Sequence, residues 1–250
     1  MSVTLRSQSI LPGAEQFDQY LPLLAGKKVG LFANQTTVLS NKTHLVDALM
    51  KKGITISRIF SPEHGFRGTA DAGEKVESSV DAATGIKVVS LYGKNRKPSA
   101  ADLAEIDILV FDIQDIGVRF YTFISSLEEF METAIEAGKP LLVLDRPNPN
   151  GFYIDGPVLE RPYKSFVGMQ PVPVVYGMTI AEYAKMILGE KWLNSSLQEK
   201  IPGFQLTIIP CANYTHKSKY TLPVKPSPNL PDMSAIYWYA STCYFEGTVL

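Results

Sequence analysis

Carboxylates, arginines, amides and tyrosines gather directly after short apolar runs of this 250-residue sequence. The polar segments that follow these runs are Asn34–Thr37, Ser61–Gly68, Tyr92–Gly93, Asp112–Tyr121 and Asp145–Pro149. In an open parallel sheet, ligands bind beyond the carboxyl ends of the strands, and such segments would meet there. Carboxylates and tyrosines without a phosphate-binding loop or a metal pattern fit the hydrolysis of glycosidic bonds best. We therefore expect one edge of a sheet to carry the chemistry.

Each of these side chains also has a structural explanation. An aspartate after a strand, such as Asp145, usually caps the following helix or turn, and Asn34 can form an Asx turn. Arginines often pair with nearby acids. Asp112 is harder to explain in this way, because a carboxylate within an apolar strand needs partners when it is buried. The Pro-Glu-His-Gly loop at 62–65 is constrained in conformation and favours a functional role.

Several common functional motifs are absent from the sequence. It contains no Gly-x-Gly-x-x-Gly turn after the first strand, no nucleotide-binding P-loop and no Gly-x-Ser-x-Gly elbow. The histidines, His44, His64 and His216, fit no zinc-binding spacing. The aspartyl-phosphate hydrolases carry a second acid two residues after the first, whereas Asp115 stands three residues after Asp112. We therefore expect neither a cofactor nor a bound metal.

The elements that must position these residues follow from the apolar patterns. Strands are expected at Lys28–Ala33, Ile54–Phe60, Ile86–Leu91, Asp107–Ile113, Leu141–Leu144 and Phe204–Ile209. Helices are expected at Thr43–Lys52, from Ser99 through Glu105, and at Phe123–Ala137, Ile180–Leu188 and from near Asp232 onward. The alternation of strands and helices predicts an α/β fold, with a Rossmann-like, mostly parallel sheet covered by helices on both faces.

Composition and charge describe an ordinary globular protein. Hydrophobic residues make up 45% of the chain, charged residues 20%, and the formal net charge is -1. This balance provides no general attraction for nucleic acid or an anionic membrane. No apolar run approaches the roughly 20 residues of a membrane span. Cys211 and Cys243 are expected to be small buried side chains rather than a disulfide framework.

The chain is expected to divide into three parts. Residues 1–26 would form an N-terminal extension, and residues 27–220 a Rossmann-like catalytic domain. Residues 221–250 would form a proline-rich connection and the start of a truncated auxiliary domain. The segment Met1–Pro12 lacks the apolar core of a signal peptide. We expect an extracytoplasmic protein, periplasmic or secreted, whose signal peptide has been removed, with a cytoplasmic protein as the alternative.

Several motifs in a fixed order resemble one known family. SPEHGFRG at Ser61–Gly68, DIQDIGVRFYTF at Asp112–Phe123, LDRPNPNG at Leu144–Gly151 and PSPNLP at Pro226–Pro231 are similar to the NamZ-type exo-β-N-acetylmuramidases. GLFANQT at Gly30–Thr36, GPVLE at Gly156–Glu160 and FEGT at Phe245–Thr248 support the resemblance. It implies a Rossmann-like domain joined to a smaller auxiliary domain, with the active site between them. The implied activity is release of N-acetylmuramic acid from non-reducing ends of peptidoglycan chains or fragments.

The resemblance suggests roles for the candidate residues. Glu63 is expected to be the general acid that protonates the leaving oxygen, and His64 would orient it. Asp112 or Asp115 would polarise the substrate acetamide or balance the positive charge of the transition state. The expected substrate-binding residues are Asn34, Gln35, Arg67, Tyr92, Gln114, Arg119, Tyr121, Asp145, Arg146 and Asn148.

One arginine is expected to pair with the lactyl carboxylate that distinguishes muramic acid from glucosamine. Arg119 is the first candidate, and Arg67 and Arg146 are the alternatives. Two other functions stay open at this point: a metal-dependent, phosphatase-like hydrolase, and a non-catalytic module that binds muropeptides. The sequence does not determine the oligomeric state.

Overall fold

A seven-stranded sheet forms the centre of the computed structural model, which describes residues 9–62, 66–67, 78–246 and 248. Its strands are β1 (Lys28–Ala33), β2 (Thr55–Ser61), β3 (Ser79–Val80), β4 (Lys87–Ser90), β5 (Ile108–Asp112), β6 (Leu141–Leu144) and β7 (Leu206–Ile209). They lie in the order β3-β4-β2-β1-β5-β6-β7, and the pairs are parallel except for the antiparallel pair β3–β4. The expected mostly parallel α/β fold is confirmed.

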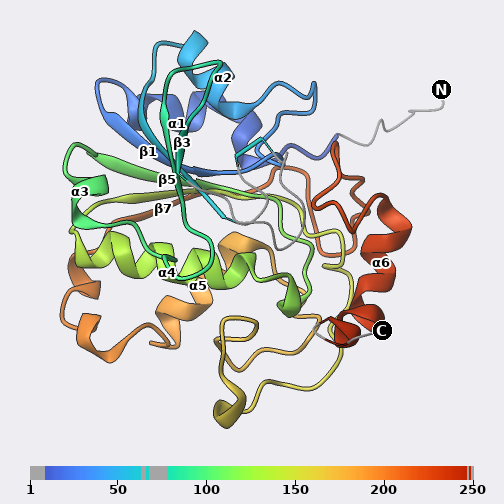
Figure 1. Ribbon diagram of the computed structural model, residues 1–250. Coiled ribbons are helices and arrows are strands. Elements are labelled where there is room, and N and C mark those ends of the chain that lie inside the picture. Colours follow the sequence, from blue (N-terminus) through green and yellow to red (C-terminus); the bar gives the residue numbers. More distant parts are fainter. Residues whose placement is uncertain (1–8, 63–65, 68–77, 247, 249–250) are drawn as a thin grey trace, which may run out of the picture.

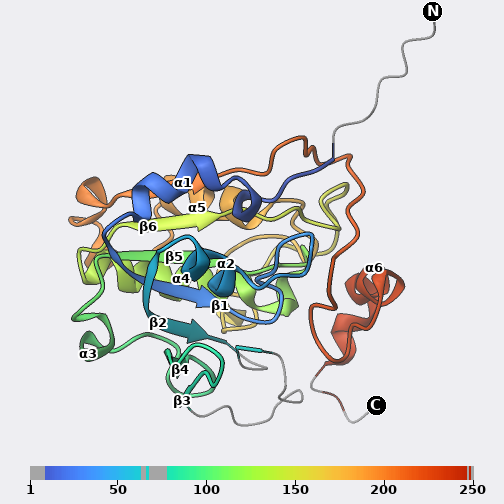
Figure 2. The ribbon, with the colours of Figure 1, turned by 90° about the horizontal axis from the view of Figure 1, so that it is seen from above.

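Helices cover both faces of this sheet (Figure 1). The α-helices of the described chain are α1 (Phe17–Leu24), α2 (Leu45–Lys51), α3 (Ala100–Leu103), α4 (Phe123–Glu136), α5 (Ile180–Gly189) and α6 (Met233–Thr242). Short 3-10 helices occur at Gly13–Glu15, Arg119–Tyr121, Arg161–Tyr163, Ser195–Leu197, Ile201–Gly203 and Cys243–Phe245. Helices α1 and α2 lie on one face, α4 and α5 lie on the other, and α6 stands beyond the carboxyl ends of the strands (Figures 1 and 2).

Local sequence signals explain where two of these helices begin. Ser99 and Asp102 form a reciprocal capping box at α3, and Thr179 and Glu182 form another at α5. Each box satisfies main-chain N–H groups that the first helical turn leaves without partners. The first turn of α5 lies next to the carboxyl end of β6, where Asp145 accepts the N–H of Ala181.

Two hydrophobic clusters hold the helices against the sheet. One contains Phe32, Phe111 and Phe130 and lies on the side of α4 and α5. The other contains Leu31 and Val110 and lies on the side of α1 and α2. Every residue of β5 is buried, as expected for a central strand with both faces covered.

The amino-terminal segment is packed onto the sheet, although the sequence-based boundary at residue 27 set it apart. Helix α1 was not predicted, and Pro22 lies inside it. Tyr20 and Leu24 are fully buried, and the main-chain N–H of Gly13 donates to the carbonyl of Asp145 at 2.7 Å. The short strand β3 was also not predicted, because both of its residues are exposed and show no apolar pattern.

The other elements agree with expectation. The proline-rich segment at 221–231 contains no helix or strand and leads into α6, where the side chain of Asp232 accepts the N–H of Ala235. Cys211 and Cys243 are both free thiols; Cys243 is buried as expected, whereas Cys211 is only half-buried. Within the described part of the chain, no helix combines the length and the apolar character that a membrane span requires.

Candidate active site

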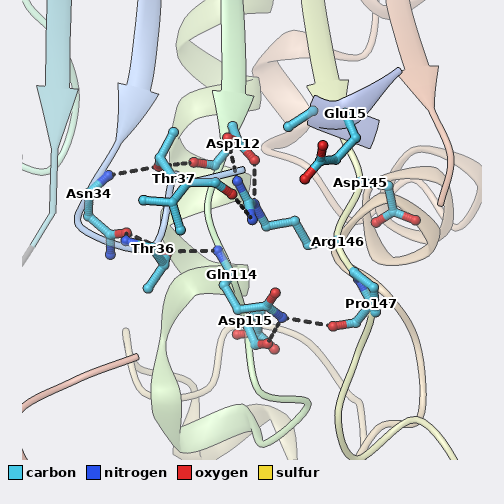
Figure 3. Close-up of polar contacts among 12 residues, drawn as sticks. Glu15, Asn34, Thr36, Thr37, Asp112, Gln114, Asp115, Asp145, Arg146 and Pro147 are labelled. Atoms are coloured by element: carbon cyan, nitrogen blue, oxygen red, sulfur yellow. Dashed lines mark hydrogen bonds and ion pairs between the residues drawn. The ribbon is translucent and has the colours of Figure 1, made fainter. Parts of the chain in front are cut away.

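The strand ends of the central sheet bring together many of the residues singled out in the sequence (Figure 3). Asp112, at the end of β5, forms a two-pronged ion pair with Arg146, which follows β6. The distances are 2.5 Å from Nε to Oδ1 and 2.8 Å from Nη2 to Oδ2. Nη1 of Arg146 donates to the carbonyl of Val38 at 3.1 Å. Burial alone would lower the pKa of Arg146, but the charge and hydrogen bonds of Asp112 raise it.

This pair has no exposed side. The side chain of Asp112 is 0% exposed and that of Arg146 is 1% exposed. All three hydrogen-bonding nitrogens of the Arg146 guanidinium are occupied by protein atoms, so it has no free fork for a ligand carboxylate. The geometry gives the pair a structural role: it ties β5 to the segment after β6.

A turn after β1 is fixed to the same place. The side-chain oxygen of Asn34 accepts the N–H and the hydroxyl of Thr36, at 2.8 and 2.6 Å. Thr37 donates its hydroxyl to the carbonyl of Asp112 at 2.5 Å, and the main-chain N–H of Gln114 donates to the Thr36 hydroxyl at 3.0 Å. Asn34 therefore forms an Asx turn, the structural role that the sequence analysis gave as its alternative to ligand binding. The hydroxyls of Thr36 and Thr37 connect the end of β1 to the end of β5.

Asp115 is a buried carboxylate that follows β5. Its Oδ2 accepts the N–H of Gly117 at 2.6 Å and the hydroxyl of Tyr176. Burial raises the pKa of Asp115 to about 6, and these two hydrogen bonds oppose the rise. Its Oδ1 is buried and has no hydrogen-bond partner among the described residues. A carboxyl with a pKa near neutrality can exchange a proton at physiological pH, as an acid–base group must.

The residues after β6 hold neighbouring loops in place. Asp145 accepts the N–H of Ala181 in the first turn of α5 at 3.1 Å, and burial raises its pKa to about 6. Asn148 donates to the carbonyl of Met178 at 2.7 Å and accepts the N–H of Asn150 at 2.8 Å. Asp145 thus accepts a main-chain N–H at the start of α5, which is the capping role that the sequence analysis gave as its structural explanation.

Two further candidates bind the proline-rich segment. The carbonyl of Pro226 accepts Nε2 of Gln35 at 2.7 Å and the hydroxyl of Tyr121 at 2.6 Å. Gln114 donates to the carbonyls of Asp115 and Pro147, each at 2.7 Å. These contacts connect motifs that lie far apart in the sequence, and they place the segment that leads to α6 against the strand ends.

The other arginines proposed from the sequence also have protein partners. Arg67 forms a two-pronged pair with Asp81, at 2.8 and 2.9 Å, and this pair lowers the pKa of Asp81 to about 2. Arg119 is 6% exposed, and its Nη1 donates to the carbonyls of Pro157 and Val172. Burial lowers the pKa of Arg119.

Unused hydrogen-bonding capacity is concentrated at the same edge of the sheet. Several buried side-chain atoms there have no partner among the described residues: Asn34 Nδ2, Gln35 Oε1, Ser61 Oγ, Ser90 Oγ, Gln114 Oε1 and Asp115 Oδ1. They belong to the last residues of β2 and β4 or to the segments that follow β1 and β5. Buried polar groups are nearly always satisfied in folded proteins, so atoms of this kind indicate where a polar ligand can bind.

A large cleft opens beside these strand ends. Its volume is about 1040 Å³, and it lies between the segments after β2 and β4, the start of α4, the loop around 166 and helix α6. Tyr92 and Tyr121, two of the residues predicted to bind substrate, line it, and so does Pro62, which immediately precedes Glu63 in the chain. Glu63 and His64 themselves lie outside the described residues.

The cleft also contains residues that sequence reasoning missed. Arg96, Phe166, Trp238 and Asn229 line it. Within helix α6, Trp238 is 69% exposed, whereas the neighbouring Tyr239 is buried. No local signal marks Arg96 or Phe166, because they come from loops that meet only in the folded chain. Aromatic faces with a few polar groups are typical of small-molecule sites, whose volumes are about 300–1,000 Å³.

A second hollow, about 720 Å³, lies over α2 and is lined by Gln35, His44 and Arg67 among others. His44 is used structurally, because its ring contacts the carbonyl of Asn34 at 3.0 Å and accepts the N–H of Val46. Among the described residues, no group of three or more His, Cys, Asp or Glu side chains is arranged to hold a metal ion.

The fold and the cleft define an α/β protein whose candidate site lies at the carboxyl edge of a mostly parallel sheet, the arrangement in which such proteins bind ligands. Residues 29–234 match the family described as the N-terminal part of the exo-beta-N-acetylmuramidase NamZ, and the chain belongs to this family. The resemblance inferred from the motifs is therefore confirmed.

Similar proteins agree with this assignment. The chain is 42% identical over 235 residues to the peptidoglycan beta-N-acetylmuramidase NamZ of Bacillus subtilis, covering 92% of this chain and 55% of that protein. Among solved structures, it matches a DUF1343 family protein of Bacteroides fragilis with 45% identity and a TM-score of 0.85, covering 96% of this chain and 63% of the other. A second DUF1343 protein of that organism has 36% identity and a TM-score of 0.82, with coverage of 94% and 59%. The chain thus spans little more than half the length of these relatives.

Proposed function

We propose that this protein is a glycoside hydrolase that releases N-acetylmuramic acid from non-reducing ends of peptidoglycan chains or fragments. Its family membership and its 42% identity to a protein named peptidoglycan beta-N-acetylmuramidase support this proposal. Because peptidoglycan lies outside the cytoplasm, we also propose an extracytoplasmic location, as the sequence led us to expect.

The observation that carries the proposal is the aromatic cleft at the carboxyl edge of the sheet. Flat aromatic side chains such as Trp238 and Phe166 offer apolar faces of the size of a sugar ring, and Ser227 and Asn229 offer groups for hydroxyls. Pro62 lines the same cleft and immediately precedes Glu63 in the sequence. Glycoside cleavage requires a proton donor for the leaving oxygen, and we assign that role to Glu63.

Within this proposal, Glu63 protonates the leaving oxygen and His64 orients it. Asp115 is the better candidate for the second carboxylate, because its pKa of about 6 and its unpartnered Oδ1 leave it capacity for a new interaction. Asp112 is less suited to the role, since both of its oxygens are bound by Arg146. Asp115 would polarise the acetamide of the substrate or balance the positive charge that develops at the anomeric carbon.

A chromogenic β-glycoside of N-acetylmuramic acid tests the proposal directly. The protein should release the chromophore from this compound, and it should release free N-acetylmuramic acid from peptidoglycan glycan chains, as detected by mass spectrometry. The Glu63→Gln variant is the matched control, because it keeps the shape of the side chain and removes the acid. Binding of the sugar without turnover would favour the non-catalytic module, and turnover that depends on an added divalent ion would favour the metal-dependent hydrolase.

A further inference from the structure

The aromatic cleft contains one positively charged side chain among its described lining residues. Among the described residues that line the cleft, Arg96 is the only one with a positive charge, and Glu246 is the only one with a negative charge. Glu246 accepts a hydrogen bond from the Tyr239 hydroxyl, so this acid already has a partner in the cleft wall. An anionic group on a ligand in this cleft therefore has Arg96 as its counter-charge.

Arg96 differs from the arginines that the sequence suggested. Arg67 and Arg146 are paired with aspartates, and Arg119 donates to main-chain carbonyls. Arg96 is exposed, lines the cleft, and forms no ion pair with a described carboxylate. Its guanidinium keeps the planar fork of donors that matches a carboxylate.

Phe166 holds Arg96 in position. The centre of the guanidinium lies 3.8 Å from the centre of the Phe166 ring, and both residues line the cleft. The ring sits at the tip of a tight turn, in which Ser165 and Gly168 exchange main-chain hydrogen bonds of 2.9 and 3.0 Å. A guanidinium stacked on an aromatic face loses little further freedom when it binds, and its N–H groups point along the edge of the plane.

We propose that Arg96, stacked on Phe166, is the specificity-determining residue that binds the carboxylate of the sugar in the cleft. This inference rests on the proposed function, in which the ligand is N-acetylmuramic acid and the carboxylate is that of its lactyl group. N-acetylglucosamine lacks this group, so it gains nothing from Arg96. The sequence analysis named Arg119 first for binding the lactyl carboxylate. We assign this contact to Arg96 instead, because Arg96 lines the cleft.

Matched variants and matched substrates test the proposal. Arg96→Ala is compared with Arg96→Lys, and with Lys94→Ala as a control on a neighbouring cation of the same loop that does not line the cleft. The substrates are chromogenic β-glycosides of N-acetylmuramic acid, of its lactyl amide, which has no charge, and of N-acetylglucosamine. KM and kcat are measured for each pair.

The carboxylate contact predicts a specific pattern. Arg96→Ala should raise KM for the muramic acid glycoside by about 10- to 100-fold, the size of one charge-assisted contact, with kcat nearly unchanged. KM for the lactyl amide and the glucosamine compound should not change. Arg96→Lys should recover part of the loss, and Phe166→Leu should raise KM by about two- to fivefold, because it removes only the stacking. Lys94→Ala should match the unmodified protein.

The outcomes separate this inference from the proposed function. If the unmodified protein cleaves the muramic acid glycoside and Arg96→Ala cleaves it equally well, the assignment of Arg96 is wrong and the function stands. An equal loss on all three substrates would also overturn the assignment, because it would give Arg96 a structural role. If no glycoside is cleaved, the function fails. Calorimetric titration with free N-acetylmuramic acid then still tests the contact: weaker binding by Arg96→Ala supports it, and equal affinity overturns it.

Discussion

Replacement of Asp115 by asparagine tests the electrostatic environment of the strand ends. The buried carboxyl has a pKa of about 6, raised from 3.8 by burial and opposed by hydrogen bonds from Tyr176 and Gly117. Below pH 3.8 it is protonated in the folded and the unfolded chain alike. Between pH 3.8 and 6 the unfolded chain ionises first, so folding stability falls as the pH rises. Above about pH 6 the cost is constant.

The size of this cost follows from the two pKa values. A rise from 3.8 to about 6 corresponds to about 3 kcal/mol of lost folding free energy at neutral pH. Asparagine cannot ionise, so the Asp115→Asn variant avoids this cost. It introduces a separate penalty of about 1–3 kcal/mol, because its NH₂ group replaces the unpartnered Oδ1, but that penalty does not depend on pH. The difference in stability between variant and wild type should therefore shift by about 2.4 kcal/mol in favour of the variant from pH 4 to pH 7.5, because part of the cost is already present at pH 4.

Urea unfolding at several pH values measures this difference. Asp145 and Glu128 also have raised pKa values, of about 6 and about 7, but they are present in both proteins and cancel in the comparison. The Tyr176→Phe variant is a second test. It removes a hydrogen-bond donor that favours the ionised form, so the pKa of Asp115 should rise further. The pH range over which stability falls should then extend to higher pH. A stability difference that stays the same across this pH range would refute the reasoning, because the buried carboxyl would then carry no ionisation cost.

Three further predictions concern the site and its support. Glu63→Gln should lower kcat by about 10²-fold or more without loss of structure by circular dichroism, and near wild-type turnover would remove Glu63 from the mechanism. Turnover should persist in a chelator, since no metal is expected; activity that is lost and then restored by a divalent ion would contradict this. Arg146→Ala should reduce the free energy of unfolding by about 3–5 kcal/mol, because it leaves Asp112 buried without its partner. Arg67→Ala, whose side chain is 34% exposed, should cost less in the same denaturant titration, and equal losses would show that burial does not set the cost.

Local pattern was sufficient for most of the fold. Apolar runs predicted six strands, and those strands are present with ends that differ by a residue or two. Ser99 was predicted to cap a helix and does so. Helix α1 was missed because it is short and contains Pro22, which argues against a helix interior. Strand β3 was missed because two exposed residues carry no alternation that could be detected.

The sequence by itself determined the fold class, the edge of the sheet that gathers polar groups, and the family, because strand periodicity, helix caps and ordered motifs are all local. Only the tertiary structure decided which of those groups face a cleft. Asp112 and Arg146 stand 34 residues apart and are both polar, yet they neutralise each other in the interior. Arg96 and Phe166 lie on unrelated loops and meet in the cleft wall. Contacts of this kind depend on strand order and on how distant loops pack, and neither can be predicted from residue spacing along the chain.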